Sequence, residues 1–253
     1  MRIDLHPGPG WRRLSLAGLL LAAAAQGQEV APPLELVYLP RGCFQMGSAT
    51  GERHERPVHE VCVESFELGK FEITQAQWRS VMGGNPSRFT ACGDNCPVER
   101  VSWNEVQEFI ARLNAQKRGV FRLPTEAEWE YACRSGGKAE DYAGGGIADL
   151  DELAWYSKGD AGNTTHLVGA KKPNALGLHD MSGNVWEWVQ DRFTSPYGAK
   201  PGDPDARIED KRVLRGGSWD AKANDVRCAI RNRQDADRRD PRLGFRVARE
   251  IAR

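Results

Sequence analysis

The stretch RLPTEAEWEYA at residues 122–132 decides the local fold at the centre of the chain. Within it, Thr125 is followed three positions later by Glu128. At this spacing the hydroxyl and the carboxylate each accept a hydrogen bond from the other residue's backbone N–H, and this arrangement begins a helix. Two glycines at residues 136–137 then supply a natural end. The stretch therefore predicts a short helix that begins after Thr125 and runs to Cys133.

The same capping pattern predicts two helices upstream. Thr74 is followed by Gln77, and Ser102 is followed by Glu105, each at the three-residue spacing. After Ser102, apolar residues recur at positions that share one helix face, namely 106, 109, 110 and 113. We expect this second helix to pack that face against the core.

Regular signals are sparse elsewhere in the chain. Alternating or short apolar runs predict strands at residues 34–39, 58–63, 212–215 and 244–247. Segments rich in Gly, Asp and Pro predict loops at residues 137–151 and 196–210. A few helices, many short strands and long irregular segments indicate an α+β fold with little regular secondary structure.

The composition is that of one globular domain. The chain has 253 residues, of which 40% are hydrophobic, and it has no repeat of solenoid or propeller length. This balance excludes a disordered tail, a collagen-like repeat and a coiled coil. A chain of this length can bury one large core, so we expect a single domain over residues 28–253.

The zero net charge hides a gradient along the chain. Residues 211–253 contain 13 Lys and Arg against 6 Asp and Glu, an excess of about +7 that the acidic residues of 28–210 balance. The basic residues are interleaved with acidic ones, and no RNA- or DNA-binding motif accompanies them. We therefore predict no nucleic-acid partner.

The first 27 residues are typical of a secretory leader. Basic residues precede an apolar run of 12 residues at positions 14–25, and small residues follow it. A membrane anchor is the alternative, but a bilayer span needs about 20 apolar residues. We predict a signal peptide at residues 1–27, export to the periplasm or the medium, and no membrane span after cleavage.

Six cysteines in an exported chain indicate disulfides rather than free thiols. Cys92 and Cys96 lie in a turn-rich segment and can close a small loop; a zinc site would need a second ligand pair at a matching spacing. Cys43 and Cys62 flank a predicted hairpin, which leaves the cysteines at 133 and 228 for each other. Six cysteines allow 15 pairings, so this assignment stays open.

Seven phrases of the chain form a recognisable set. They are RLPTEAEWEYA at 122–132, GNVWEW at 183–188, RGGSW at 215–219 and LGFR at 243–246, with GCFQMG at 42–47, PVH at 57–59 and PVERVSW at 97–103. Together they resemble the formylglycine-generating enzyme, or sulfatase-modifying factor, family. The resemblance covers about residues 36–249 and implies a C-type-lectin-like α+β fold of the formylglycine-generating type.

The resemblance extends to the fold but not to the copper ligands of the family's oxidases. The family's oxidases convert a cysteine of a sulfatase to formylglycine with molecular oxygen, using two copper-binding cysteines shortly after the Gly-Gly-Ser phrase. Here residues 216–228 contain a single cysteine, Cys228. The resemblance implies that Cys228 occupies a structural position of the family, where it would form a disulfide with Cys133. Cuprous ion prefers thiolate ligands, so we expect no copper and assign no catalytic residue.

We therefore expect a binding or accessory module rather than an oxidase. The first alternative is a true formylglycine-generating oxidoreductase. The second is an enzyme of a cell-envelope or secondary-metabolite pathway that uses the same pocket for other chemistry.

The resemblance also implies a calcium ion. The family's ligand positions match Asp180, Gly183, Val185 and Glu187, which would supply two carboxylates and two backbone carbonyls, with water completing the shell. The alternative is that Asp180 caps a turn and Glu187 pairs with an arginine. The family's other calcium site lacks a donor here, because the matching position is Leu153.

A polar stretch at residues 219–242 is the remaining candidate binding surface. It is dense in Asp, Asn and Arg, and arginine offers a fork of donors that suits carboxylates. The alternative is a solvated loop whose arginines pair with neighbouring aspartates and with the acidic body. We predict that a protein or small-molecule ligand contacts Ser218, Trp219, Asp220, Arg227 and Arg231.

Overall fold

The structure is a computed structural model that describes Met1 and residues 33–117, 119–158, 162–199 and 207–251. The predicted signal peptide, apart from Met1, lies outside the described residues. None of the described helices is both long enough and apolar enough to cross a lipid bilayer.

The first sheet joins the beginning of the domain to its end. Its four antiparallel strands lie in the order β1 (Leu36–Leu39), β4 (Phe66–Gly69), β10 (Ala248–Arg249) and β5 (Phe121–Arg122). A separate hairpin pairs β2 (Gly42–Met46) with β3 (His59–Val63). Because β10 lies between β4 and β5, the last described strand is held inside the sheet.

The second sheet contains the long hairpin of the C-terminal half. Its order is β8 (Asn232–Gln234), β7 (Arg207–Arg215), β6 (Trp186–Ser195) and β9 (Leu243–Gly244), with β9 parallel to β6. The hairpin of β6 and β7 contains register shifts.

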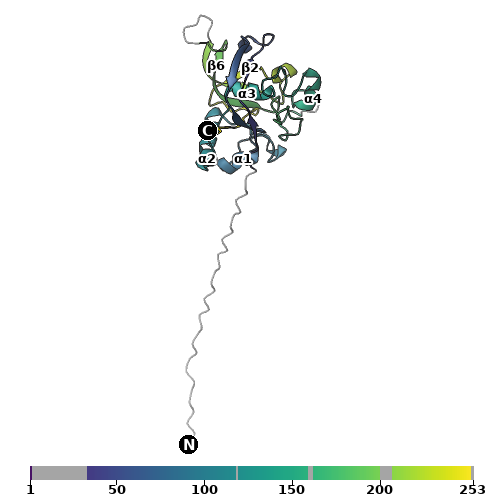
Figure 1. Ribbon diagram of the computed structural model, residues 1–253. Coiled ribbons are helices and arrows are strands. Elements are labelled where there is room, and N and C mark those ends of the chain that lie inside the picture. Colours follow the sequence, from purple (N-terminus) through teal and green to yellow (C-terminus); the bar gives the residue numbers. More distant parts are fainter. Residues whose placement is uncertain (2–32, 118, 159–161, 200–206, 252–253) are drawn as a thin grey trace.

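The predicted helix starts are confirmed. Thr74, Ser102 and Thr125 each accept a hydrogen bond from the backbone of the third helical residue and complete a capping box. The helices are α1 (Gln75–Met82), α2 (Trp103–Ala115), α3 (Glu126–Cys133) and the short α4 (Leu150–Leu153). Figure 1 shows α1 and α2 together at one end of the molecule and α3 at its centre.

The apolar face of α2 is buried as expected. Val106, Phe109, Ile110 and Leu113 lie in one core cluster, and the ring of Phe109 stacks on Trp78 of α1 with centroids 5.3 Å apart. Phe245, which follows β9 near the end of the chain, packs edge-on against both of these rings. The two helices are thereby packed against the C-terminal segment.

Three local predictions differ from the structure. The loop expected at 196–210 includes the first residues of β7, which begins at Arg207 and not at the predicted residue 212. The loop expected at 137–151 contains a 3-10 turn at Ile147–Asp149 followed by the start of α4. The single strand expected at 244–247 is divided between β9 and β10, which belong to different sheets. The chain crosses from one sheet to the other here because Phe245 and Val247 are fully buried in the core between them.

The α+β class and the scarcity of regular secondary structure are confirmed by the four short helices and the strands of two to ten residues in the described chain. The core consists of two large apolar clusters with a smaller third one under α4.

Three disulfides cross-link the domain with the pairing expected from the sequence. Cys43 is bonded to Cys62 across the β2–β3 hairpin, and the other bonds join Cys92 to Cys96 and Cys133 to Cys228. All six cysteines are described, and none is free.

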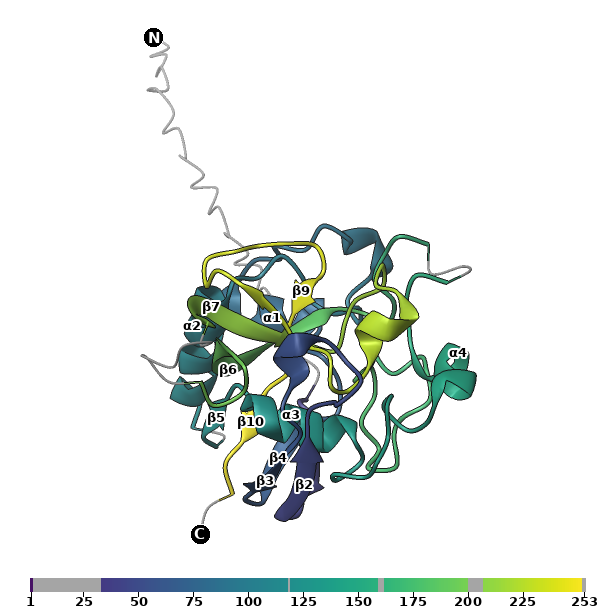
Figure 2. The same ribbon diagram turned by 90° about the horizontal axis from the view of Figure 1, so that it is seen from above.

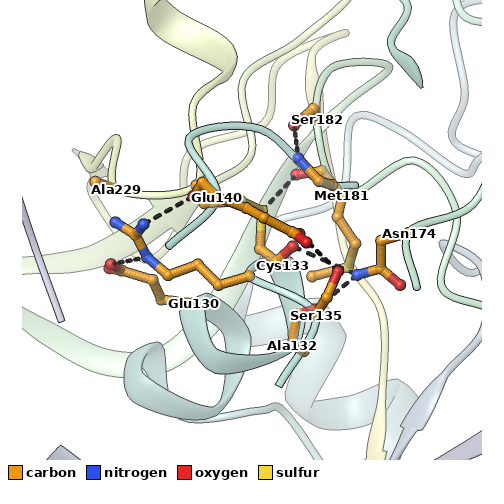
Figure 3. Close-up of a disulfide and its surroundings, with 12 residues drawn as sticks. Glu130, Ala132, Cys133, Ser135, Glu140, Asn174, Met181, Ser182 and Ala229 are labelled. Atoms are coloured by element: carbon orange, nitrogen blue, oxygen red, sulfur yellow. Dashed lines mark hydrogen bonds and ion pairs between the residues drawn. A yellow bond between two sulfur atoms is a disulfide. The ribbon is translucent and has the colours of Figure 1, made fainter. Parts of the chain in front are cut away.

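Figure 3 shows the surroundings of Cys133, where the amide of Asn174 donates to the backbone carbonyls of Ala132 and Cys133 at 2.7 and 3.4 Å. Both Cys133 and Cys228 are fully buried. This bond therefore ties the end of α3 to the C-terminal third from inside the core.

Two of the three disulfides differ strongly in the length of chain that they close. The Cys133–Cys228 bond closes a loop of 95 residues, and the Cys92–Cys96 bond closes a loop of 4. Replacing the first pair with Ala should lower the free energy of unfolding by about 5 kcal/mol, and replacing the second pair by about 2 kcal/mol, because a longer closed loop restricts the unfolded chain more. Urea denaturation of the two double variants measures both losses. A larger loss for the short loop would contradict this assignment.

Candidate functional site

The basic C-terminal stretch is neutralised by the acidic body of the protein. Each of its main arginines meets a carboxylate from an earlier part of the chain, as the alternative interpretation of the sequence required. The pairs are Arg215–Glu130, Arg227–Glu55, Arg231–Glu126, Arg239–Glu105, Arg246–Glu187 and Arg249–Glu67. The stretch at 219–242 is therefore not a free cationic surface.

A cavity of about 400 Å³ lies between this stretch and the loop after β2. The loop contributes Glu52 and His54, which lie at the short 3-10 turn η1 (Arg53–Glu55), and β6 contributes its first residue, Trp186. A second, smaller cavity of about 310 Å³ shares Glu52 and Asp225 with the first one. We call the two together the paired pocket.

The structure places four of the five predicted ligand residues at these cavities and the fifth, Trp219, against a neighbouring aromatic ring. Ser218, Asp220 and Arg231 line the larger cavity, and Arg227 lines the smaller one. The ring of Trp219 instead packs edge-on against Phe89, with centroids 5.6 Å apart. Three of the five residues are thus brought together, and Trp219 is separated from them.

Neither predicted arginine offers a free fork. The Nε and Nη2 of Arg231 donate to the carboxylate of Glu126, and its Nη1 donates to two backbone carbonyls. Arg227 donates from both Nη atoms to Glu55 at 2.9 Å and from Nε to the carbonyl of Asn224. Every guanidinium nitrogen of the two residues is already engaged, so they hold the pocket walls in place.

Three residues that line the larger cavity, Glu52, His54 and Trp186, lie outside the stretch at 218–242 that the sequence indicated as a binding surface. Trp186 lies inside the GNVWEW phrase and could have been found from it. Glu52 and His54 are more than 130 residues away from the other residues that line the larger cavity, so only the tertiary structure reveals them there. Burial lowers the pKa of His54, and a neighbouring arginine opposes its positive charge further.

The predicted calcium ligands lie around a buried arginine. Both oxygens of Glu187 accept from Arg246, at 2.7 and 2.8 Å, and one also accepts from the indole of Trp129 at 2.8 Å. Asp180 accepts from the backbone N–H of Gly169 through Oδ2, but its Oδ1 is buried without a hydrogen-bond partner.

A third carboxylate, which the sequence did not single out, lies beside these two. Glu72 accepts from the side chain of Asn184 at 2.6 Å and from the backbone of Val185 at 3.1 Å. Burial raises its pKa well above the usual range, and the charges of Asp180 and Glu187 raise it further. Burial likewise raises the pKa of Asp180 to about 6. Three buried carboxylates therefore face one guanidinium, that of Arg246.

This imbalance fits a bound cation. The unpartnered Oδ1 of Asp180 is the kind of hard oxygen ligand that calcium prefers. No three acidic, histidine or cysteine side chains of the described chain converge as a metal-binding group. A calcium ion would therefore depend on Asp180 and Glu187 together with backbone carbonyls, such as those of Gly183 and Val185, and on water.

Sulfur is absent from the cavity walls. Ala221 lines the larger cavity, and Cys228, the one cysteine of the stretch after the Gly-Gly-Ser phrase, is buried and bonded to Cys133. No described residue offers a thiol there.

Known proteins resemble the chain over nearly its whole length. The model of the sulfatase-modifying factor enzyme 1-like domain matches residues 22–251. The chaperone protein LppX of Paenibacillus barcinonensis is 30% identical, over 93% of this chain and 95% of its own length. The formylglycine-generating enzyme of Streptomyces coelicolor is 31% identical, over 90% of this chain and 94% of its own length.

A similar solved structure is variable protein 1 of Treponema denticola. It superposes with a TM-score of 0.75 at 29% identity, over 85% of this chain and 94% of that one. The superposition supports the formylglycine-generating type of C-type-lectin-like fold.

The structural role of Arg231 can be measured. Arg231→Met should lower the free energy of unfolding by about 3 to 5 kcal/mol, because it leaves the buried carboxylate of Glu126 without its partner. Arg239→Met is the matched control, since Arg239 pairs with Glu105 at an exposed position and should change stability by less than about 1 kcal/mol. Chemical denaturation compares the two variants. Equal stability of both would mean that the Arg231 pair does not hold the pocket wall.

Proposed function

Because the chain belongs to the sulfatase-modifying factor enzyme 1-like family, whose domain spans residues 22–251, we propose that it is a non-oxidase binding or accessory module of that family. Its binding site is the larger cavity of the paired pocket. The protein is exported and uses the inherited scaffold without the copper-dependent reaction.

The state of the cysteines is the observation that carries this proposal. A cuprous site needs soft thiolate ligands, and all six cysteines of the chain are in disulfides. The pocket wall has Ala221 and Asp225 in the stretch where the family's oxidases have their copper ligands. The only cysteine of that stretch, Cys228, is fully buried and so is withheld from a substrate.

Two further observations favour binding over oxidation. The cavity of about 400 Å³ falls in the size range of small-molecule sites. A relative that is 30% identical over most of both chains is named a chaperone, a role that rests on binding. The three disulfides support export, because such bonds persist in oxidising compartments.

A second candidate function is that of the family's oxidases. The similarity to the Streptomyces coelicolor formylglycine-generating enzyme, at 31% identity over nearly the whole of both chains, favours it. One assay separates the two functions.

The assay supplies the purified protein with cuprous ion, oxygen and a sulfatase peptide that contains the target cysteine. We expect no aldehyde by mass spectrometry and no oxygen uptake, because no thiolate pair is present to bind the metal. The Streptomyces coelicolor enzyme serves as the positive control. Aldehyde formation that disappears in Cys228→Ser would reinstate the oxidase.

We also propose that calcium stabilises the domain at Asp180. Its carboxylate has one oxygen without a partner, and the surrounding buried charge is negative in excess. Glu187 would take part through the lone pair that its bond to Arg246 leaves on Oε1, while Gly183 and Val185 would contribute backbone carbonyls. Calcium here would act as a structural ion and supplies no chemistry to the pocket.

Saturating calcium should raise the melting temperature by about 5 °C or more, and a chelator should reverse this, because an ion that binds only the folded state stabilises it. Asp180→Asn should abolish the response, since it removes the charge of the unpartnered carboxylate while leaving the Glu187–Arg246 pair intact. Differential scanning calorimetry measures both, with Glu60→Gln, an exposed carboxylate on β3, as the control. A melting temperature that ignores calcium and chelator alike would exclude the ion.

A further inference from the structure

The hairpin of β2 and β3 has a disulfide on its outer face. Cys43 and Cys62 stand directly opposite each other in the antiparallel register, and both residues are exposed. We call this bond the hairpin disulfide. The other face of β2 is directed toward the core, where Phe44 and Met46 are buried and the ring of Phe44 packs edge-on against Tyr131. The hairpin is therefore anchored to the core independently of its disulfide.

The other two disulfides are covered by the protein. Cys133 and Cys228 are both fully buried. Cys96 is also fully buried, and Cys92 is half-buried, with the carbonyl oxygen of Thr165 only 3.2 Å from its sulfur atom. A thiolate must reach a sulfur atom to break a disulfide. Because all six cysteines are described, the hairpin disulfide is the one bond whose two ends are both exposed to such attack.

The hairpin disulfide closes the loop that forms one wall of the paired pocket. It joins positions 19 residues apart, and the loop at residues 47–58 contributes Glu52 and His54 to the larger cavity. Figure 2 shows β2 and β3 at the edge of the molecule and the dark blue turn η1 of their loop next to the yellow-green turn η4 (Ala223–Val226). The two sulfur atoms lie on the strands, and neither cysteine lines a cavity of the pocket.

Polar contacts hold the same loop against the C-terminal stretch. Glu55 accepts from both Nη atoms of Arg227 at 2.9 Å, and the backbone carbonyl of His54 accepts from Arg231 at 2.6 Å. These contacts remain when the disulfide is open. A two-stranded hairpin adds little stability of its own, however, so the loop loses its main covalent constraint. Opening the bond should therefore make the loop more mobile without unfolding the domain.

We propose that the hairpin disulfide is a reversible redox site, which an external dithiol reduces while the domain stays folded, and that its reduction loosens the loop wall of the paired pocket. The matching partner is a protein dithiol, because its second thiol resolves the mixed disulfide that forms first. The inference does not depend on the proposed binding function, since neither cysteine lines the pocket.

The reaction is a pair of thiol–disulfide exchanges. A thiolate of the dithiol attacks the sulfur of one hairpin cysteine, the S–S bond breaks, and the other cysteine leaves as a thiolate that takes a proton from water. The second thiol of the reductant, as its thiolate, then attacks the mixed disulfide and releases the first cysteine, which is protonated in turn. Two electrons pass to the hairpin, which gains two thiols, and the reductant becomes a disulfide.

The experiment treats the full mature protein with dithiothreitol, stops the reaction with iodoacetamide at intervals, and reads each cysteine by peptide mass spectrometry. We expect the hairpin pair to react first, about a hundredfold faster than Cys133 and Cys228, because a buried bond is attacked only when the core opens. Circular dichroism should remain unchanged through this first phase. Oxidised dithiothreitol should then restore the hairpin disulfide.

Hydrogen exchange tests the link to the pocket wall. In protein reduced only at the hairpin, amide exchange in residues 47–58 should increase about fivefold, because the loop is no longer closed covalently, while exchange in α2 should not change. The double variant Cys43→Ser/Cys62→Ser should show the same faster exchange without any reductant and should lack the first phase of reduction.

The double variant Cys92→Ser/Cys96→Ser is the matched control, since it removes a disulfide outside the hairpin. It should keep both the first phase of reduction and the slow exchange of the loop.

Three outcomes would overturn the inference. The first is that another disulfide reacts before the hairpin pair or as fast as it. The second is loss of the circular dichroism signal of the wild-type protein during the first phase, which would mean that the fold requires the bond. The third is unchanged exchange in residues 47–58 after reduction, which would refute the link to the pocket wall.

Discussion

The buried glutamates of α3 are the constraint on which the rest of the structure depends. Glu126, Glu128 and Glu130 are almost completely buried on one short helix. A carboxylate removed from water is tolerated only with a charged or hydrogen-bonding partner. Glu128 pairs with Arg122 of the adjoining strand β5. The partners of the other two come from the C-terminal third: Glu126 pairs with Arg231, and Glu130 pairs with Arg215. The helix thereby fixes where the last 40 residues or so must lie.

The same pairing determines the character of the pocket. A chain whose C-terminal stretch is strongly basic would be expected to present arginines to a ligand. Because the acidic body engages those guanidinium groups, the side chains left unpaired at the cavity are carboxylates. The positive charge of the C-terminal stretch is therefore neutralised inside the folded protein.

The segment from Arg215 to Cys228 is held in place by a disulfide and by an ion pair. Cys228 closes a bond to Cys133 at the end of α3, and Arg215 of β7 pairs with Glu130 one turn earlier on that helix. Both interactions secure the segment that in the family's oxidases contains the copper ligands. A wall held by a buried disulfide and buried ion pairs is suited to a preformed binding site.

The sequence by itself determined the helix starts at Thr74, Ser102 and Thr125, the family and the general fold, because capping boxes and the phrases of the family are local patterns. It could also suggest the cysteine pairs. Only the tertiary structure decided that Trp219 packs on Phe89, that Arg231 pairs with Glu126, and that Glu52 meets Asp225 across a cavity. These partners are 100 or more residues apart, and the sign of the charge left at a pocket depends on which of them meet, which no local pattern encodes.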